Sequence, residues 1–397
     1  MTVEIVFTGN GPGELAGWVR PVAHAMKDVA AERRIALHMT MALTPSQFAS
    51  GREAEVIGEW ALFDRILEPA ESVKLAIGVS RFSAAGAGTL VHLGGDLWFS
   101  ARLSARAGLP ACVLAETTHV ARRHAAFAHV FATSENVASR LIQSGIPREK
   151  VSVSGDPRVD AVSPHPTPLP QGERERVEGY VVSFMPGSRD YLFRALVPYF
   201  LNIADQLHRQ EHVRFQMVVS PFLPHEVIDA VRQDAQRTFP DLALAWIVNE
   251  PWPALGESDF VVTVPGTNTV ELAAAGVPFA AIAPEELIDH LRLEGLANWI
   301  TRLPVIGRPL KRAVALRAVR RQRFIALPNQ HAGRLIVPEW IGTWPEDAFI
   351  SYLRQLLQDR PRRAHMSDSL SGLYAGARGA SRRIAERSLG LAGGPGR

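Results

Sequence analysis

Residues 259–279 read DFVVTVPGTNTVELAAAGVPF and contain, in close succession, the signals of a strand, a tight turn and a helix. Phe260–Val264 is an apolar run rich in β-branched residues, as expected of a buried strand. Pro265 and Gly266 break this run, and from Asn268 the apolar residues recur at helical spacing until Gly276. This strand–turn–helix segment constrains the fold strongly, because it is the repeating unit of doubly wound α/β domains.

The turn in this segment has the chemistry of a ligand site. Backbone N–H groups at the start of a helix are free to bind a phosphate or a sugar oxygen. Glu271, one helical turn further on, could accept hydrogen bonds from two neighbouring hydroxyl groups. The alternative is that Asn268 and Glu271 only form a capping box, which needs no ligand.

The same alternation runs through the rest of the chain. Near the N-terminus, strand-like Val3–Phe7 is followed by a glycine-rich loop and then by a helical pattern over Leu15–Met26. The glycine spacing of the loop differs from the dinucleotide-binding fingerprint, so a simple tight turn is the alternative to a ligand loop. Further predicted strands are Ile35–Leu43, Thr89–Leu93, Pro110–Leu114, Val130–Thr133, Val151–Val153, Tyr180–Phe184, Phe215–Ser220 and Ala243–Val248.

A change of composition divides the chain, whose 397 residues suffice for two domains. Residues 164–178, PHPTPLPQGERERVE, combine four prolines with a charge cluster and no apolar periodicity, which predicts an exposed linker. We therefore predict a first Rossmann-like domain over 1–163 and a second over 179–345. Residues 346–397 are predicted to be helical, with helices over Asp347–Leu357 and Leu370–Leu389.

Three blocks of the sequence resemble one family. The run Gly266–Pro278, GTNTVELAAAGVP, is similar to the nucleotide-sugar motif of GT-B glycosyltransferases, and more closely to that of the lipid-A-disaccharide synthase family. Phe184–Arg189 (FMPGSR) and Leu327–Arg334 (LPNQHAGR) match two further blocks of that family in the same order. The resemblance implies the α/β GT-B fold, in which two doubly wound Rossmann-like domains face a cleft and the last helices, here 346–397, cross back to the first domain.

The resemblance also implies that a UDP-sugar donor binds to the second domain. Sugar transfer releases a negatively charged diphosphate, which needs fixed positive potential, and Arg189 is expected to supply it. No Asp-x-Asp triplet occurs in the chain, so we predict that transfer needs no metal and no other cofactor. A structural turn is the alternative role for the third block. The predicted donor-binding residues are Gly187, Ser188, Arg189, Gly266, Thr267, Asn268, Glu271, Asn329 and Arg334.

The catalytic base is expected in the first domain, where the acceptor would bind. Asp96 follows a predicted strand and resembles a carboxylate of the family, although it could instead cap the next helix. Glu14 and His92 are the alternatives, and the predicted catalytic residues are therefore Asp96, Glu14 and Arg189. Asp156 replaces the histidine of a Gly-His-Pro turn of the family, which leaves the role of that histidine unassigned. The predicted acceptor-side loop contains Gly9, Asn10, Gly11 and Gly13.

A basic block lies between Gly295 and Ile325. It has eight basic residues and no acidic residue, interleaved with Trp299 and aliphatic side chains. This mixture favours an anionic membrane surface, with a solvated helix face as the alternative. A nucleic-acid partner is disfavoured because few aromatic residues are available for stacking. The predicted membrane-facing residues are Arg302, Arg308, Lys311, Arg312, Arg317, Arg320 and Arg321.

Cysteine content and hydropathy indicate the compartment. The single cysteine, Cys112, lies in an apolar run and is expected in the core, so no internal disulfide is predicted. Neither a signal peptide nor an apolar run long enough to cross a bilayer is apparent. We expect a cytoplasmic protein bound peripherally to the inner face of the cytoplasmic membrane.

Together these patterns predict a hexosyltransferase. By resemblance it would transfer an acylated glucosamine from a UDP-sugar to an acylated sugar-phosphate lipid, with inversion at the anomeric carbon. A related GT-B transferase with a different lipid or sugar acceptor, a UDP-sugar 2-epimerase and a non-catalytic membrane-surface protein are the alternatives. The exact sugars and the oligomeric state are not predicted.

Overall fold

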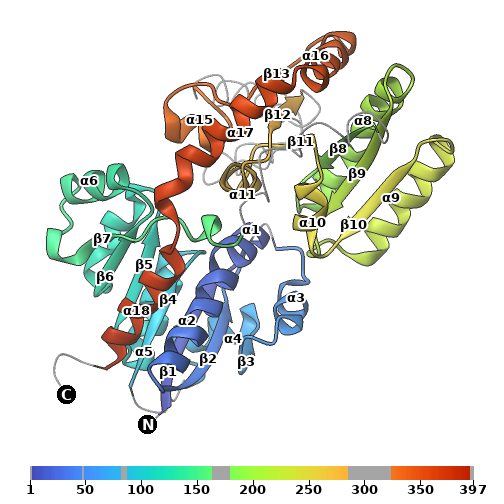
Figure 1. Cartoon of the computed structure of the whole chain (residues 1–397). Helices are drawn as coiled ribbons and strands as arrows, with labels where there is room; N and C mark the ends of the chain where they lie inside the picture. The colour runs from blue at the N-terminus through green and yellow to red at the C-terminus, as the bar shows by residue number, and fades with distance from the viewer. Residues whose placement is uncertain (1, 47–48, 82–86, 163–178, 285–322, 394–397) are drawn as a thin grey trace, which may run out of the picture. The chain divides into compact units, whose positions relative to one another are not determined.

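The computed structural model describes residues 2–46, 49–81, 87–162, 179–284 and 323–393 (Figure 1). These residues form two compact units, of which the first comprises 1–161 with 376–397 and the second comprises 162–375. Each unit is a parallel sheet with helices on its faces. The predicted linker 164–178 and the seven predicted membrane-facing residues lie outside the described residues.

Unit 1 is built on a seven-stranded sheet with the order β3-β2-β1-β4-β5-β6-β7. All its strand pairs are parallel, and β1 and β4 are buried over nearly their whole length, which suits the apolar residues Ile5–Phe7 and Leu90–Val91 at their centres. The strands are β1 (Thr2–Gly9), β2 (Ala36–Leu43), β3 (Arg65–Leu67), β4 (Gly88–His92), β5 (Ala111–Ala115), β6 (His129–Ala132) and β7 (Val151–Val153).

Two helices far apart in sequence, α2 and α18, lie side by side against the sheet of unit 1 (Figure 1). A second apolar cluster joins β-strand residues such as Leu90 and Val113 to Leu75 of α4 and Leu103 of α5. Cys112 is fully buried, as predicted for a core residue. The helices of unit 1 are α1 (Pro12–Glu14), α2 (Arg20–Glu32), α3 (Glu53–Glu59), α4 (Pro69–Ile77), α5 (Leu97–Ala107), α6 (Glu135–Gln143) and α18 (Ala380–Ala392).

The helical segment after β1 is not a regular α-helix. Between α1 and α2 the chain makes a π-helical turn over Leu15–Val19, in which the Arg20 N–H donates to the Leu15 carbonyl. Pro21 follows and has no N–H group, so it leaves the Gly17 carbonyl without its usual intrahelical partner. The wider π turn accommodates this break, and such turns recur at functional sites.

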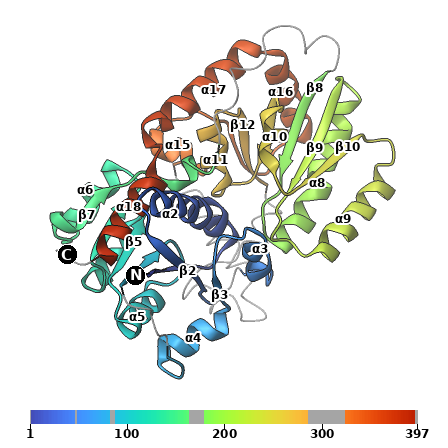
Figure 2. The same ribbon diagram turned by 60° about the horizontal axis from the view of Figure 1, so that its bottom comes forward.

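Unit 2 is built on a six-stranded sheet with the order β10-β9-β8-β11-β12-β13. Its core includes the aromatic ring of Phe184. The ring centroids of Phe200 and Phe215 lie 5.1 Å and 6.0 Å from the Phe184 centroid. Helices α8 and α9 pack against each other beside β9 (Figure 2). The strands are β8 (Tyr180–Met185), β9 (Val213–Val219), β10 (Leu244–Val248), β11 (Phe260–Thr263), β12 (Phe279–Pro284) and β13 (Glu339–Gly342). The helices are α8 (Asp190–His208), α9 (His225–Thr238), α10 (Pro251–Gly256), α11 (Asn268–Ala275), α15 (Leu327–Ala332), α16 (Glu346–Gln358) and α17 (Arg360–Tyr374).

The predicted single helix over Leu370–Leu389 is wrong. Helix α17 ends at Tyr374, and α18 starts only at Ala380, after Gly379 with φ of +80°. The carboxylate of Asp160 explains the new start, because it accepts hydrogen bonds from the backbone N–H groups of Gly379 and Ser381, both at 2.7 Å. A side-chain acceptor at a helix start satisfies N–H groups that the helix itself leaves unpaired.

Candidate functional site

The strand order of unit 2 reverses between β8 and β11. Open α/β sheets bind ligands at such a switch point, outside the carboxyl ends of the strands. Residues 186–189 follow β8 and residues 264–267 follow β11, and the two strands pair in parallel with Met185 opposite Thr263. The two turns that the sequence predicted as donor-binding therefore lie next to each other at this point.

The turn after β8 depends on a glycine. Gly187 has φ of +95°, a conformation that side chains disfavour. A Cβ atom at this position would lie 3.5 Å from Val264, which shows how closely the two turns approach. Arg189 occupies the cap position before the 19-residue helix α8, where unpaired N–H groups and the helix dipole favour an anion.

The turn after β11 does not contain the capping box that was the alternative interpretation. Thr267, not Asn268, precedes the first residue of α11, and no side chain caps the helix start. The Asn268 amide instead donates to the hydroxyl of Thr263, which donates to the Met185 carbonyl at the end of β8. This chain of hydrogen bonds joins the two turns, and Glu271 lies in the first turn of α11.

Asn329 corrects one prediction for the third block. It is fully buried, and its amide nitrogen donates to the Val337 carbonyl and to the Glu339 carboxylate, both at 2.8 Å. Its oxygen accepts from the N–H groups of Ile336 and Val337. Because an asparagine side chain has two N–H donors and two acceptor sites, nothing is left for a donor or an acceptor sugar. Arg334 is exposed in the segment that leads into β13.

The strand order of unit 1 reverses in the same way, between β1 and β4. Glu14 follows β1, and its Oε2 atom accepts long hydrogen bonds from the N–H groups of Asn10 and Gly11, both 3.3 Å away. A Cβ atom at Gly94, just after β4, would come within 2.1 Å of this same oxygen. The Glu14 carboxyl group therefore packs directly against the backbone of the loop after β4, which only glycine permits.

This packing changes the acidity of Glu14. Burial raises the pKa of its carboxyl group, and hydrogen bonds from the backbone of Gly11, Asn10 and Gly95 only partly oppose the shift. The carboxylate of Glu116 adds a smaller upward contribution. A carboxyl group whose pKa moves toward neutrality at a switch point is suited to proton transfer.

The predicted acceptor-side loop surrounds Glu14. Gly11 precedes α1, Gly13 lies within it, and the Cβ position of Gly9 packs against Val19 and Leu15. Asn10 lies near Gly95 of the facing loop, since a Cβ atom added to Gly95 would be 3.2 Å from the side-chain amide nitrogen of Asn10.

Asp96 caps helix α5. Its Oδ1 atom accepts a hydrogen bond of 2.7 Å from the Trp98 N–H, which is the cap role weighed above. The residue is also exposed at the loop after β4, so its role as a base stays a prediction. The alternative base His92 is buried and hydrogen-bonded to Thr8 and Ser100, and burial lowers its pKa to about 4. His92 is therefore a neutral core residue.

A buried charge cluster in unit 1 was not predicted as a unit. The Arg158 guanidinium, 1% exposed, bonds to both Asp156 and Glu116 and lies over the indole of Trp18 at 5.0 Å. The Trp18 Nε1–H donates to Asp156 at 3.1 Å. Burial alone would raise the pKa of Asp156, but Arg158 overrides it and holds that pKa below its usual range. Asp156, which replaces the family histidine, thus orients an arginine instead.

Glu116 connects this cluster to the switch point. It follows β5, the neighbour of β4, and its side chain is 32% exposed. Its pKa is raised by burial, in opposition to the charge of Arg158. The carboxyl ends of β1, β4, β5 and β7 thus carry Glu14, Asp96, Glu116 and Asp156.

The described residues contain no group of three or more metal-ligand side chains. Within the same residues, no helix has the length and apolar character needed to cross a bilayer.

Comparisons with known proteins relate part of this chain to one family. Residues 153–284, which include the turns after β8 and β11, match the family model described as lipid-A-disaccharide synthetase. The lipid-A-disaccharide synthase of Pseudomonas fluorescens is 29% identical over 218 residues, which cover 54% of this chain and 50% of that protein. The resemblance to the lipid-A-disaccharide synthase family is confirmed. The match spans about half the length of the curated relative.

Solved structures show the fold. S. aureus MnaA, solved with UDP, superposes with a TM-score of 0.57 at 13% identity, covering 98% of this chain and 97% of that one. The UDP-GlcNAc 2-epimerase of Neisseria meningitidis, solved with UDP-GlcNAc, gives a TM-score of 0.53 at 16% identity, with 98% and 100% covered. At such identities the likeness concerns the fold alone, and the chain has the GT-B fold that the synthase resemblance implied.

Proposed function

We propose that this protein is a glycosyltransferase that transfers the sugar of a UDP-sugar to an acylated sugar lipid. The observation that carries the proposal is the pairing of two donor turns at the switch point of unit 2, within the residues that match the synthase family. The Gly187 turn with Arg189 would bind the diphosphate, and the Gly266 turn with Glu271 would bind the nucleoside. The proposal includes no metal, because the chain has no Asp-x-Asp triplet.

In the proposed reaction, an acceptor hydroxyl oxygen attacks the anomeric carbon of the donor sugar from the face opposite UDP. The new C–O bond forms as the bond to the diphosphate breaks, and the electron pair of that bond leaves with UDP. The positive charge of Arg189 and the field of the α8 start would stabilise the leaving diphosphate. Attack from the opposite face inverts the anomeric configuration.

The hydroxyl proton would pass to a carboxylate of unit 1. Glu14 is the base that the structure favours, because burial raises its pKa and Gly94 leaves room for its carboxyl group. Asp96 is the second candidate, since it lies exposed after β4. Two variants separate these candidates: Glu14→Gln should lower transfer by about 10²–10⁴-fold, while Asp96→Asn should mainly destabilise α5. The reverse result would assign the base to Asp96.

The acceptor defines the remaining part of the proposal. An acylated glucosamine phosphate and an acylated glucosamine donor are what the synthase resemblance suggests, and the basic block between Gly295 and Ile325 would dock the enzyme on anionic lipid. Each basic side chain near such a surface contributes about 1 kcal/mol, and the attraction falls as salt shortens the Debye length. Arg317, Arg320 and Arg321 changed together to Gln should weaken binding to anionic vesicles without changing UDP affinity. Equal vesicle binding by this variant and its parent would remove the membrane from the proposal.

Mass spectrometry of lipids from cells that lack the protein tests the function. Accumulation of a monosaccharide lipid, reversed by the intact gene but not by the Arg189→Ala variant, is the expected result. An unchanged lipid profile would contradict it. Incubation of the protein with UDP-GlcNAc alone separates the epimerase alternative, because only an epimerase would convert the free nucleotide sugar without an acceptor.

A further inference from the structure

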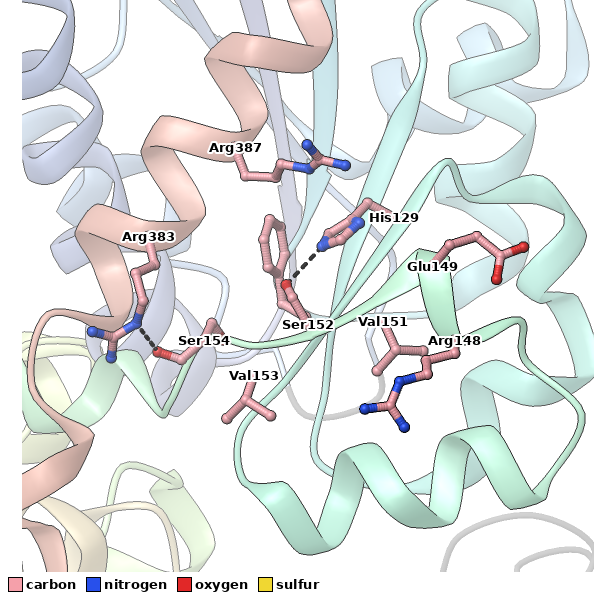
Figure 3. A pocket seen from close by; sticks show the side chains of 10 residues that line it. His129, Arg148, Glu149, Val151, Ser152, Val153, Ser154, Arg383 and Arg387 are labelled. Carbon is pink, nitrogen blue, oxygen red and sulfur yellow. Dashed lines mark hydrogen bonds between the residues drawn. The ribbon is translucent and has the colours of Figure 1, made fainter.

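A pocket of about 720 Å³ opens on unit 1 away from the switch point, where β6 and β7 lie beside α18 (Figure 3). His129 and Phe131 alternate along β6 and so share one face of the sheet. Ser152 pairs in register with Phe131 and faces the same way. Helix α18 contributes Arg383 and Arg387 to one wall, and the turn before β7 contributes Arg148 and Glu149.

The pocket has an excess of positive charge, since three arginines and one glutamate line it. Arg383 is held in place by the carbonyls of Ser154, at 2.7 Å, and Arg378, at 2.9 Å. Over the described residues, neither Arg148 nor Arg387 has a hydrogen-bond or ion-pair partner. Two unpaired guanidinium groups beside one pocket are suited to the bidentate binding of an anion's oxygens.

His129 provides the second, independent observation. The residue is 4% exposed, and its Nε2 atom shares a hydrogen bond of 2.7 Å with the Ser152 hydroxyl. Its Nδ1 atom is buried and has no hydrogen-bond partner in the described structure. A buried polar atom without a partner is destabilising, so its retention beside unpaired cations needs a reason.

Burial and the nearby Arg387 lower the pKa of His129 to about 4, so the ring is neutral at pH 7. The other charged groups of the pocket are Arg148, Glu149 and Arg383. A bound anion would offset the positive charge and raise the pKa of His129.

We propose that this pocket binds a phosphate monoester, with Arg148 and Arg387 pairing with its oxygens and the His129 Nδ1–H as the donor beneath it. The volume falls within the range of small-molecule sites. The site is separate from the proposed donor and acceptor sites, because β4 and β5 lie between β6 and the β1 switch point. The ester could be a soluble sugar phosphate or the headgroup of a lipid.

The test uses the full-length protein with labelled histidine, observed by NMR at pH 7 in the presence of saturating UDP. Inorganic phosphate and glucose 6-phosphate are the soluble probes, and His129→Gln assigns the resonance. We expect a saturable shift of the His129 signal and a rise of its pKa. The double variant Arg148→Gln/Arg387→Gln should weaken binding at least tenfold.

Arg382→Gln is the matched control, because it removes the same charge from the same helix while its partners are Glu32 and Glu386, outside the pocket. It should leave phosphate affinity unchanged. The proposal would be overturned by a His129 signal that stays unchanged in millimolar phosphate, up to a 50-fold molar excess over the protein. A signal that shifts equally in the double variant would overturn it as well. If the double variant does not fold, the two single variants carry the same test, each with a smaller loss.

Vesicles that contain phosphatidic acid distinguish the two sources of the ester. Binding to these vesicles that glucose 6-phosphate displaces, and that the double variant loses, would identify a lipid headgroup. Tight binding of glucose 6-phosphate without vesicle binding would identify a soluble ester. Vesicle binding that depends only on the Gly295–Ile325 block, with no response at His129, would contradict the site.

Discussion

At the scale of single residues, Glu14 combines an unfavourable environment with a central place in the proposed reaction. Its carboxyl group is packed against the backbone of Gly94, and the long hydrogen bonds from Asn10 and Gly11 compensate only in part for the lost water. Ionisation of such a group costs folding free energy. Such a costly group is retained where the chemistry of a site needs it.

Glu14→Gln should lower transfer by about 10²–10⁴-fold, the usual contribution of a general base. It should also stabilise the protein at alkaline pH. Because the folded-state pKa is raised, the carboxyl group's stabilising contribution is complete below its unfolded pKa and is lost as pH rises through the folded pKa. The gain in melting temperature should therefore be larger at pH 8 than at pH 4. A gain that is independent of pH would show that the Glu14 carboxyl group does not titrate as the structure indicates.

Asp156 should behave in the opposite way. Asp156→Asn leaves Arg158 buried with one acidic partner fewer, and breaking a buried ion pair costs about 3–5 kcal/mol of folding free energy. Since the folded-state pKa of Asp156 is lowered, its contribution exists above the unfolded pKa and is lost as pH falls through the folded pKa. Urea unfolding at pH 7 measures the loss of folding free energy. The control is Arg382→Gln, which removes an exposed ion pair with Glu32. A loss below 1 kcal/mol would show that the cluster does not stabilise unit 1.

Some of these residues could be predicted from the sequence and others could not. Glu14 and Asp96 could be predicted because each follows a strand, and strand ends are visible in the hydrophobic pattern. The pair of Trp18 and Asp156 could not, because the two are 138 positions apart and meet only in the folded unit. The one available signal was the change from the family histidine to Asp156 with Arg158 two residues later.

At the scale of elements, the proposed function depends on the turns that follow strands β8 and β11. These turns were predicted correctly in position because proline and glycine mark them in the sequence. Asn329 was misread, since its block resembles a motif while its hydrogen bonds to Val337 and Glu339 depend on the fold around it. The break between α17 and α18 was missed because its cause, Asp160, lies 219 positions before Gly379.

Gly187→Ala tests the turn after β8. With φ of +95°, an alanine at this position should strain the backbone by about 1–3 kcal/mol and displace Arg189 from the start of α8. We expect UDP affinity to fall at least tenfold in calorimetric titration. Gly108→Ala is the matched control, since Gly108 also has positive φ, +66°, but lies at the end of α5 in unit 1 with open space at its Cβ position. Equal losses of affinity in both variants would mean that general strain, and not the donor turn, is responsible.

At the scale of the whole molecule, the chain repeats one architectural solution. Both units place their first and fourth strands side by side, and in both the residues predicted to bind substrate follow the carboxyl ends of those strands. In unit 2 this chemistry is an arginine with two turns rich in backbone N–H groups, and in unit 1 it is a set of carboxyl groups. We propose that the arginine and the two turns of unit 2 bind the diphosphate of a UDP-sugar.

Calorimetric titration of the full-length protein with UDP, in excess chelator, measures this binding. We predict saturable binding of one UDP per chain, and a loss of at least tenfold in affinity for Arg189→Ala. In turnover measurements the same variant should raise the barrier to transfer by about 2–4 kcal/mol. Arg194→Ala is the control, because Arg194 lies one turn further along α8 and pairs with Asp190 on the surface. Absence of UDP binding in chelator, or equal affinity of the Arg189→Ala variant and its parent, would contradict the proposal.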